Sequence, residues 1–215
     1  RWRGTAVAAA PRTSARGERI VLVLAGLCGL AAAYGWFVEP RWPEVTNVRI
    51  ASPKMAGASR PVRIVPLSDF HCDPAPRLEE RIPDLVVAER PDLIVFTGDT
   101  INSAAGLPVL KRCLTLLAAF APTFAVKGNW DVGYWNQLNL FGGTGVRELN
   151  GEAVRGEAAG TAVWVAGVSV TAESRIPEAM ARIPGGEYAV LLYHYPYPEV
   201  VDGAFQAVPR FLFLA

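Results

Sequence analysis

The sequence has few cysteines and almost no net charge, and each of these features excludes a class of site or partner. Its three cysteines, Cys28, Cys72 and Cys113, are widely scattered among 215 residues, which supports neither a disulfide framework nor a thiolate zinc site. The formal net charge is only +1, so we expect no nucleic-acid partner. With 51% apolar residues, the chain has enough hydrophobic sequence for one domain of ordinary size and a short appendage.

Both ends of the sequence are abrupt. The first residue is Arg1 rather than methionine, and the last, Ala215, ends an apolar run with no turn or cap after it. We therefore expect the sequence to be truncated at both ends.

Residues 20–38 form a long apolar segment without a charge, with Tyr34 and Trp36 near its end. As a helix it would be about 28 Å long, close to the roughly 30 Å hydrocarbon thickness of a bilayer. A buried core helix fits poorly, because such helices seldom lack a polar face. A cleaved signal peptide is the stronger alternative, although the segment is longer than a typical h-region and lacks a clear small-x-small site. We predict an uncleaved, single-pass transmembrane helix.

The flanks of this segment differ in charge. Residues 1–19 form a basic segment with five arginines and one acid, Glu18, whereas the other flank mixes acids and arginines. The positive-inside rule then keeps the N-terminus in the cytoplasm and puts the following domain on the extracytoplasmic side. Residues 39–61 contain four prolines, which indicates a linker, with an edge strand expected at residues 45–50.

From residue 62 to residue 215, short β-rich runs alternate with stretches of helical spacing. This alternation predicts a layered α/β domain with largely parallel strands. We expect strands at 62–67, 92–97, 123–126, 162–170, 188–193 and 210–214, and helices at 78–90, 107–120, 173–182 and 199–207.

Polar residues follow the predicted strands: Asp69 and His71, then Asp99, then Asn129 and Asp131, and later His194. The carboxyl ends of strands in an open α/β sheet converge on one crevice, so these side chains can share a site. Their oxygen and nitrogen donors suit Mn²⁺, Fe or Zn²⁺. Taken singly, each residue has a structural explanation as a turn residue, helix cap or hydrogen-bonded histidine. The ordered set, with both histidines of the chain directly after strands, favours a metal site.

Four blocks of sequence carry a family resemblance. They are Ser68-Asp69-Phe70-His71, Thr97-Gly98-Asp99-Thr100, Lys127-Gly128-Asn129-Trp130-Asp131 and Leu192-Tyr193-His194-Tyr195-Pro196. In order and content the blocks resemble four of the five blocks of the calcineurin-like metallophosphoesterases. The apolar segment followed by Glu39-Pro40 and Val45-Thr46 further resembles the N-terminally membrane-anchored or exported bacterial branch of that family. The fifth block of that family is a Gly-His-x-His turn after an apolar strand. The sequence stops after such a strand, so we expect truncation just before this block.

The resemblance implies a four-layer α/β/β/α sandwich with two divalent metal ions, Mn, Fe or Zn. Asp69 and His71 would hold the first ion, Asn129 and His194 the second, and Asp99 would bridge them. A carboxylate has two oxygens and can span two cations, which in such hydrolases lie roughly 3.5 to 4 Å apart. The implied reaction is hydrolysis of a phosphate ester or phosphoanhydride by in-line attack of water on phosphorus.

The sequence departs from the family at Trp130, where most members have a histidine that resembles a proton donor. Tryptophan has one N–H donor and cannot act as a general acid at neutral pH. If Trp130 contacts substrate, we expect stacking or an indole hydrogen bond, and a leaving group of low pKa. Asp131 receives no catalytic assignment, and Cys72 is expected to be a loop residue rather than a ligand.

Two functions remain open from the sequence. The first is a metal-dependent hydrolase acting on a phosphorylated small molecule or a lipid-linked substrate near the bilayer. The second is a catalytically degenerate, membrane-tethered binding or scaffold module. Trp130 and the missing last block favour the second, whereas retention of five ligand-type residues favours the first.

Overall fold

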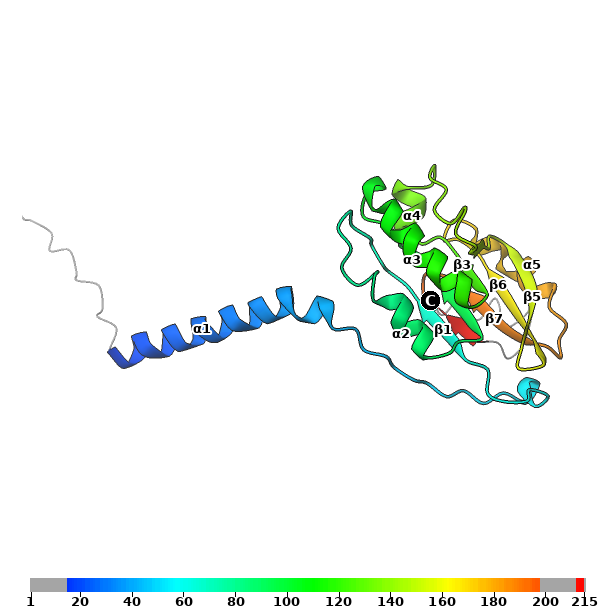
Figure 1. Cartoon of the computed structure of the whole chain (residues 1–215), viewed down its shortest axis with the longest axis horizontal. Coiled ribbons are helices and arrows are strands. Elements are labelled where there is room, and N and C mark those ends of the chain that lie inside the picture. The colour runs from blue at the N-terminus through cyan, green and yellow to red at the C-terminus, as the bar shows by residue number, and fades with distance from the viewer. Residues whose placement is uncertain (1–14, 198–211, 215) are drawn as a thin grey trace, which may run out of the picture. The chain divides into compact units, whose positions relative to one another are not determined.

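The computed structural model describes residues 15–197 and 212–214, and its chain divides into two compact units, Arg1–Asn47 and Val48–Ala215 (Figure 1). The predicted helix at 199–207 and the start of the last predicted strand lie outside the described residues. The two units are described separately below.

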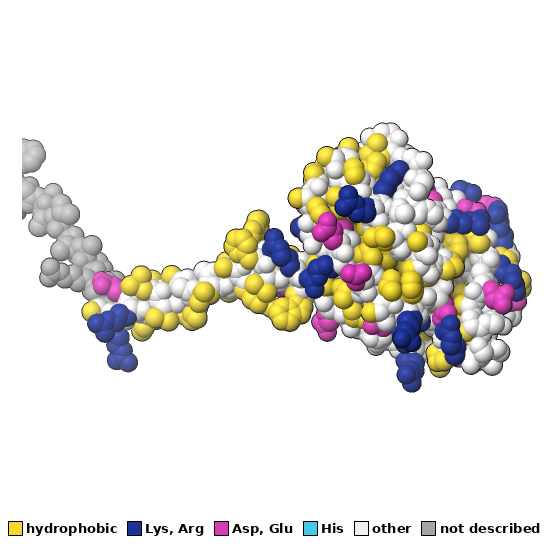
Figure 2. Space-filling model, viewed as in Figure 1, with side chains coloured by type: hydrophobic (Ala, Val, Ile, Leu, Met, Phe, Trp, Pro, Cys, Tyr) yellow, Lys and Arg dark blue, Asp and Glu magenta, His cyan; other side chains and the backbone are white. Residues whose placement is uncertain are grey.

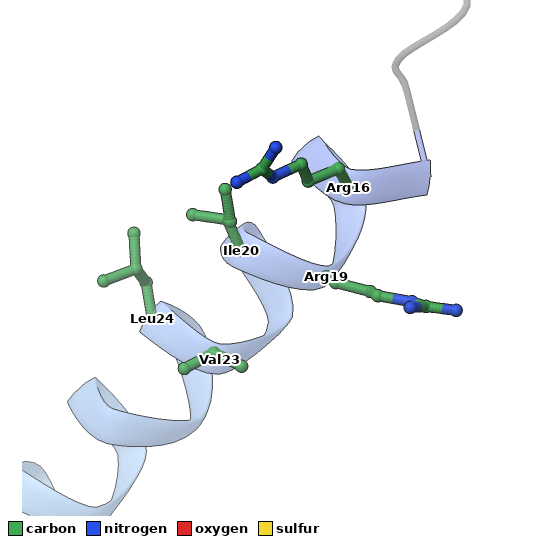
Figure 3. Close-up of a pocket in the computed structure, with 5 residues that line it drawn as sticks. All are labelled: Arg16, Arg19, Ile20, Val23 and Leu24. Atoms are coloured by element: carbon green, nitrogen blue, oxygen red, sulfur yellow. The ribbon is translucent and has the colours of Figure 1, made fainter.

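In the N-terminal unit, helix α1 (Ala15–Phe37) runs for 23 residues with no buried side chain. Its exposed surface is apolar almost throughout, as the yellow side chains along it show (Figure 2). Arg16 and Arg19 lie at its first turn beside Ile20, Val23 and Leu24 (Figure 3). These five residues belong to one helix, so the hollow between them does not indicate a binding site. The helix is long and apolar enough to cross a membrane, and a signal sequence fits the same description.

The segment after α1 corrects one expectation. It contains 3₁₀ turns at Glu39–Arg41 and Pro53–Met55, but no strand at residues 45–50. Val45, Val48 and Ile50 are exposed there, with Val48 78% accessible. A strand needs a neighbouring strand to receive its backbone hydrogen bonds. In the described part of the chain this segment has no such neighbour, so the predicted edge strand is wrong.

The second unit contains two four-stranded sheets. The first has the order β1 (Ile64–Leu67), β2 (Leu93–Phe96), β3 (Thr123–Ala125), β4 (Arg147–Glu148) and is parallel throughout. Between its strands run α2 (Ile82–Ala88), α3 (Leu107–Phe120) and the short α4 (Asn129–Tyr134). Parallel neighbours require such crossovers. Because all of these strands point the same way, their carboxyl ends meet at one edge of the sheet.

The second sheet has the order β5 (Glu152–Ala158), β6 (Thr161–Gly167), β7 (Tyr188–Leu192), β8 (Leu212–Leu214). β5 and β6 form an antiparallel hairpin, whereas β7 and β8 continue parallel to β6. Helix α5 (Ile176–Ala181) and a preceding 3₁₀ turn (Glu173–Arg175) connect β6 to β7.

Three buried clusters show how these elements are layered. In β2, Ile94 and Phe96 pack with Leu114 of α3, whereas the alternate residue Val95 packs against the second sheet through Val190. The opposite face of β7 packs against α5 in the third cluster. The order is therefore helices, sheet, sheet, helix, as expected for the four-layer sandwich.

Element boundaries follow the sequence pattern most closely in the first sheet. Helix α3 has the predicted bounds, β1, β2, β3, β7 and β8 lie within the predicted strands, and β6 begins one residue before the strand predicted at 162–170. Helix α4 and strands β4 and β5 were not predicted. β5 carries Glu152, Arg155 and Glu157 on a partly exposed edge, so it lacks the apolar run that marked the other strands.

Candidate metal centre

The loop after β1 and the loop after β2 hold three of the predicted ligands in an unusual backbone conformation. Asp69, His71 and Asp99 have φ values of +54°, +44° and +56°, which are uncommon for residues other than glycine. Such positions cost on the order of 1 to 3 kcal/mol each and cluster at functional sites. The two loops run side by side, since Asp69 N–H donates to Gly98 and His71 N–H to Asp99, both at 3.0 Å.

Two glycines allow a third loop to approach. Gly98 has φ +107°, and a Cβ there would lie 2.2 Å from the backbone nitrogen of Gly128. A Cβ on Gly128 would lie 2.2 Å from Oδ1 of Asp99. Any side chain at either position would push the loop after β3 away from Asp99. These glycines therefore bring the start of α4 against the predicted bridging ligand.

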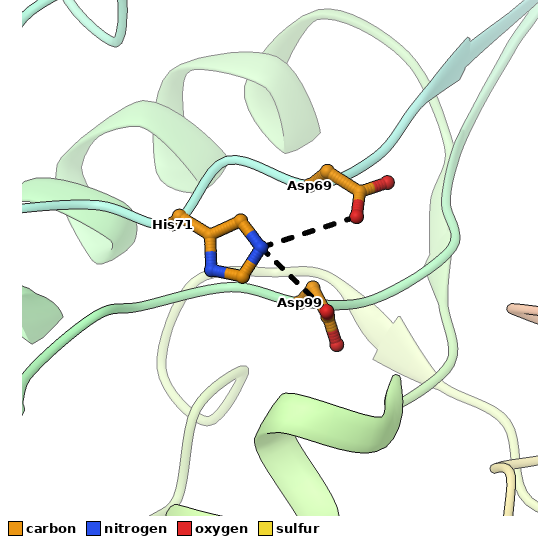
Figure 4. A group of neighbouring side chains, drawn as sticks. All are labelled: Asp69, His71 and Asp99. Carbon is orange, nitrogen blue, oxygen red and sulfur yellow. Dashed lines mark ion pairs between the residues drawn. The ribbon is translucent and has the colours of Figure 1, made fainter.

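The first three candidate ligands form one group (Figure 4). One ligand atom from each of Asp69, His71 and Asp99 can be chosen so that all three lie within 4.8 Å of one another. Nε2 of His71 is 4.0 Å from Oδ1 of Asp69 and 3.6 Å from Oδ2 of Asp99. Asp69 is exposed whereas Asp99 is buried, so the group opens from the interior to solvent.

His194, which follows β7 in the second sheet, reaches the same carboxylate. Its Nε2 lies 3.6 Å from Oδ2 of Asp99, the same distance as from His71. Its Nδ1 is 2.9 Å from the carbonyl oxygen of Thr97. A carbonyl can only accept, so Nδ1 carries a proton, and in the neutral form of the ring this leaves Nε2, which faces Asp99, as the nitrogen that can bind a metal. This is the arrangement of a metal-binding imidazole.

The spacing of these atoms fits a divalent metal ion better than direct hydrogen bonds. At 3.6 Å, the two imidazole nitrogens are too far from Oδ2 for good hydrogen bonds. An ion bound to nitrogen and oxygen at about 2.0 to 2.2 Å separates neighbouring ligand atoms by about 3 to 3.6 Å. The donor set of carboxylate oxygens and imidazole nitrogens suits Mn, Fe or Zn.

The two oxygens of Asp99 have different partners, which refines the expectation of a two-oxygen bridge. Oδ1 accepts the backbone N–H of Trp130 at 2.9 Å, and Oδ2 faces both histidines. Burial raises the pKa of the Asp99 carboxyl above its ordinary value, and the Trp130 hydrogen bond and the two imidazoles oppose this shift. A cation beside Oδ2 would offset the cost of burying this charge.

Asp131 has a role that the sequence did not reveal. Its side chain is fully buried, and Oδ2 accepts the N–H groups of Asp99 at 2.9 Å and Gly128 at 3.0 Å. Oδ1 accepts the N–H and the hydroxyl of Thr100, at 2.9 and 2.6 Å. The carboxylate therefore ties the loop after β2 to the start of α4. An acid three residues after a helix N-cap is a known capping pattern, and this signal was present in Gly128 and Asp131.

The remaining predicted residues lie around this core. Asn129 is the first residue of α4, with an exposed side chain, next to Trp130 in sequence. The half-buried Trp130 ring contacts His71 edge to face, with ring centroids 5.6 Å apart. Cys72 is buried and donates its N–H to Thr100, as expected for a loop residue.

Comparison with known families agrees with this geometry. A family model described as calcineurin-like phosphoesterase matches residues 62–196, which includes all four blocks and every candidate ligand. The chain belongs to the calcineurin-like phosphoesterase family. Members of this family are enzymes that hydrolyse phosphoesters, and they generally use divalent metal ions.

Two curated relatives support the same assignment. One is an uncharacterized metallophosphoesterase of Aquifex aeolicus, 30% identical over 180 residues, which cover 78% of this chain and 67% of the relative. Another is phosphodiesterase YaeI of Escherichia coli, 30% identical over 121 residues, which cover 53% of this chain and 44% of the relative. The second match spans less than half of its relative.

Proposed function

We propose that this calcineurin-like phosphoesterase hydrolyses a phosphodiester or phosphoanhydride with two divalent ions, Mn, Fe or Zn. Asp69 and His71 would hold one ion, and Asn129 and His194 would hold the other. Asp99 would be shared between the two ions. In addition to the shared carboxylate, the first ion would have the His71 imidazole and the Asp69 carboxylate. The second ion would have the His194 imidazole and the Asn129 amide oxygen.

One observation carries the proposal. Oδ2 of Asp99 lies 3.6 Å from Nε2 of His71 and 3.6 Å from Nε2 of His194. These histidines come from different sheets and approach the same oxygen. An oxygen placed between two imidazoles is suited to bridging two cations, and in two-metal sites the ions lie about 3.5 to 4 Å apart.

The residues of the chain divide the work of the reaction. Bound divalent ions would lower the pKa of the attacking water and would offset the negative charge of the phosphate. Asp99 and the histidines would fix the positions of the reactants for in-line displacement. Trp130 occupies the place of the expected proton donor and its indole cannot protonate a leaving group. A leaving group of low pKa departs without protonation, which favours phosphoanhydrides and activated esters.

The substrate and location follow from the same reasoning. The relative from Escherichia coli is named a phosphodiesterase, which favours a diester for this chain as well. Helix α1 would anchor the protein as a single-pass membrane protein with the catalytic unit on the extracytoplasmic side. Such anchoring supports a phosphorylated small molecule or lipid-linked substrate near the bilayer, and the low net charge gives no reason to expect nucleic acid.

The direct experiment uses the full chain in detergent after removal of metal with a chelator. We expect Mn²⁺ to restore hydrolysis of bis(p-nitrophenyl) phosphate, and Asp99→Asn to lower kcat/KM by about 10³-fold or more, since the bridging charge is lost. Asp84→Asn, an exposed acid on α2, is the control. A rate of hydrolysis that is unchanged by the chelator or by Asp99→Asn would overturn the proposal. A lack of any Mn²⁺-dependent hydrolysis would favour the scaffold function.

A further inference from the structure

A group of aromatic rings extends from the candidate metal centre along α4. The His71 ring meets Trp130 at a centroid distance of 5.6 Å, and Trp130 meets Tyr134 at 4.6 Å with an interplanar angle of 49°. Trp130 and Tyr134 are one helical turn apart, so their side chains lie on the same face of α4. We name this pair, Trp130 and Tyr134, the aromatic ledge.

The ledge is not part of the hydrophobic core. Tyr134 is 59% exposed, and the buried residue of the short helix α4 is Asp131 rather than an aromatic residue. Large aromatic side chains are normally placed where they bury most of their surface. An exposed tyrosine packed on a tryptophan that itself touches a candidate ligand is therefore placed for contact with something outside the chain.

The indole nitrogen of Trp130 lies on the inner side of the ledge. Nε1 is buried and has no hydrogen-bond acceptor among the described residues, as is also true of Nε1 in Trp135 and Trp164. Buried donors in folded proteins normally pair with protein groups or ordered water. Because Nε1 is buried, what the ledge offers to a ligand is its aromatic surface.

A second tyrosine pair near the site does not offer the same surface. Tyr195 lies beside His194 with ring centroids 5.2 Å apart, and Tyr197 stacks on Tyr195 at 4.8 Å with an angle of 22°. The two rings cover each other in this stacked arrangement. On the ledge, the larger angle between Trp130 and Tyr134 leaves the rings less covered by each other.

We infer that the substrate carries a planar aromatic ring, which stacks on the ledge while its phosphorus lies at the metal centre. This inference rests on the proposed phosphoesterase function and narrows it to aromatic phosphoesters or anhydrides. The ring can be a simple aryl group or a nucleobase, because every such ring has a π face for stacking. Trp130 then contributes binding in place of proton donation.

The experiment measures binding rather than turnover, by calorimetry on the full chain loaded with Mn²⁺ in detergent. Phenylphosphonate is compared with cyclohexylphosphonate, which has similar size but no π face. We expect the phenyl compound to bind about 5- to 10-fold more tightly, and Tyr134→Ala to reduce this preference to less than about 2-fold. Tyr134→Phe keeps the ring and should retain it.

Tyr197→Ala is the matched control, because Tyr197 is also an exposed tyrosine near the site, at 48% accessible. It should leave the phenyl preference intact. A second pair, adenosine monophosphate and ribose 5-phosphate, tests whether the ring is a nucleobase. A Tyr134-dependent preference for adenosine monophosphate indicates a nucleobase. A Tyr134-dependent preference that is seen only in the phosphonate pair indicates an aryl group.

Equal binding within both pairs, or a preference that survives Tyr134→Ala, would overturn the aromatic substrate. Such a result differs from failure of the proposed function, which would appear as a lack of Mn²⁺-dependent hydrolysis in the wild-type protein. Since binding and hydrolysis are measured separately, each inference can fail without the other.

Discussion

The buried carboxylate of Asp131 accepts the backbone N–H of Asp99 at 2.9 Å, which fixes the loop that carries the predicted bridging ligand. The same carboxylate accepts the N–H of Gly128 at the start of α4. Two acids that are 32 positions apart in sequence therefore act together, one as a candidate ligand and one as its support. Asp131 is a positioning residue, because its hydrogen bonds go to the backbone and to Thr100 rather than to the reacting groups.

This relationship predicts the effect of Asp131→Asn. Either oxygen, when replaced by an amide NH₂ group, would face two donors and leave buried N–H or hydroxyl groups unpaired. We expect a loss of about 1 to 3 kcal/mol in the free energy of unfolding, and Mn²⁺ affinity about 10- to 100-fold weaker. Urea denaturation and calorimetry measure the two effects. Asp84→Asn should change neither. An Asp131→Asn protein with wild-type Mn²⁺ affinity would show that the hydrogen bonds of Asp131 do not position Asp99.

The second prediction concerns the residue at the position of the expected proton donor. Trp130→His should raise kcat on a phosphodiester with an alkyl leaving group, by about 10- to 100-fold, because histidine can protonate a poor leaving group. The rate on p-nitrophenyl esters should change little or fall, since that leaving group needs no proton. Steady-state kinetics on both esters provide the comparison. An unchanged or lower rate on the alkyl ester would count against this account of Trp130.

A third prediction follows from the ion pair that joins the starts of β1 and β2. The Arg60 guanidinium hydrogen-bonds both oxygens of Asp92, and the N–H of Arg63 adds another bond at 2.9 Å. These contacts, with the Arg60 hydrogen bond foremost, hold the pKa of Asp92 below its ordinary value of 3.8. A lowered carboxyl pKa stabilises the folded state above the unfolded value, and this stability is lost as pH falls through the folded value.

Accordingly, Asp92→Asn should lower the thermal midpoint by a constant amount above about pH 5, and the difference from wild type should shrink as pH falls below 3.8. Thermal melts from pH 2 to 7 followed by circular dichroism measure it. A difference that grew towards low pH would have the wrong sign for this ion pair.

The fourth prediction tests the proposed membrane orientation. The native cysteines of the catalytic unit are unsuited to labelling: Cys72 and Cys113 are buried, and burial raises the pKa of both thiols, that of Cys113 to about 12. Glu80→Cys puts a thiol on an exposed position of the catalytic unit, and Arg16→Cys puts one at the start of α1. In intact cells, an impermeant maleimide should label the protein with Glu80→Cys and should label the one with Arg16→Cys only after permeabilisation. The reverse pattern would contradict the proposed topology.

The two central strands of the first sheet could be predicted from the sequence because they are buried on both sides. β2 and β3 consist of buried residues, and such strands appear as short apolar runs that end at polar residues. The same feature marked the candidate ligands, since Asp99 and Asn129 come just after these runs. The order of the blocks along the chain then gave the family, which the comparison confirmed.

The remaining features depend on contacts that a linear pattern does not contain. Residues 45–50 have the composition of a strand, but pairing depends on a neighbour that the described chain does not provide. The buried Asp131 could not be distinguished from a surface acid without knowing that three N–H groups converge on it. Likewise, only the geometry shows that a single oxygen of Asp99 faces both histidines. The assignment of Asn129 remains a prediction.

The most direct measurement is the number of Mn²⁺ ions bound per chain, by calorimetry with the full-length protein after removal of metal. The account predicts two ions for the wild type and one for His194→Ala, because His194 reaches the cluster through Asp99 from the second sheet. The Tyr197→Ala protein should still bind two. A wild-type stoichiometry of one, or no binding near micromolar Mn²⁺, would contradict the shared-carboxylate site.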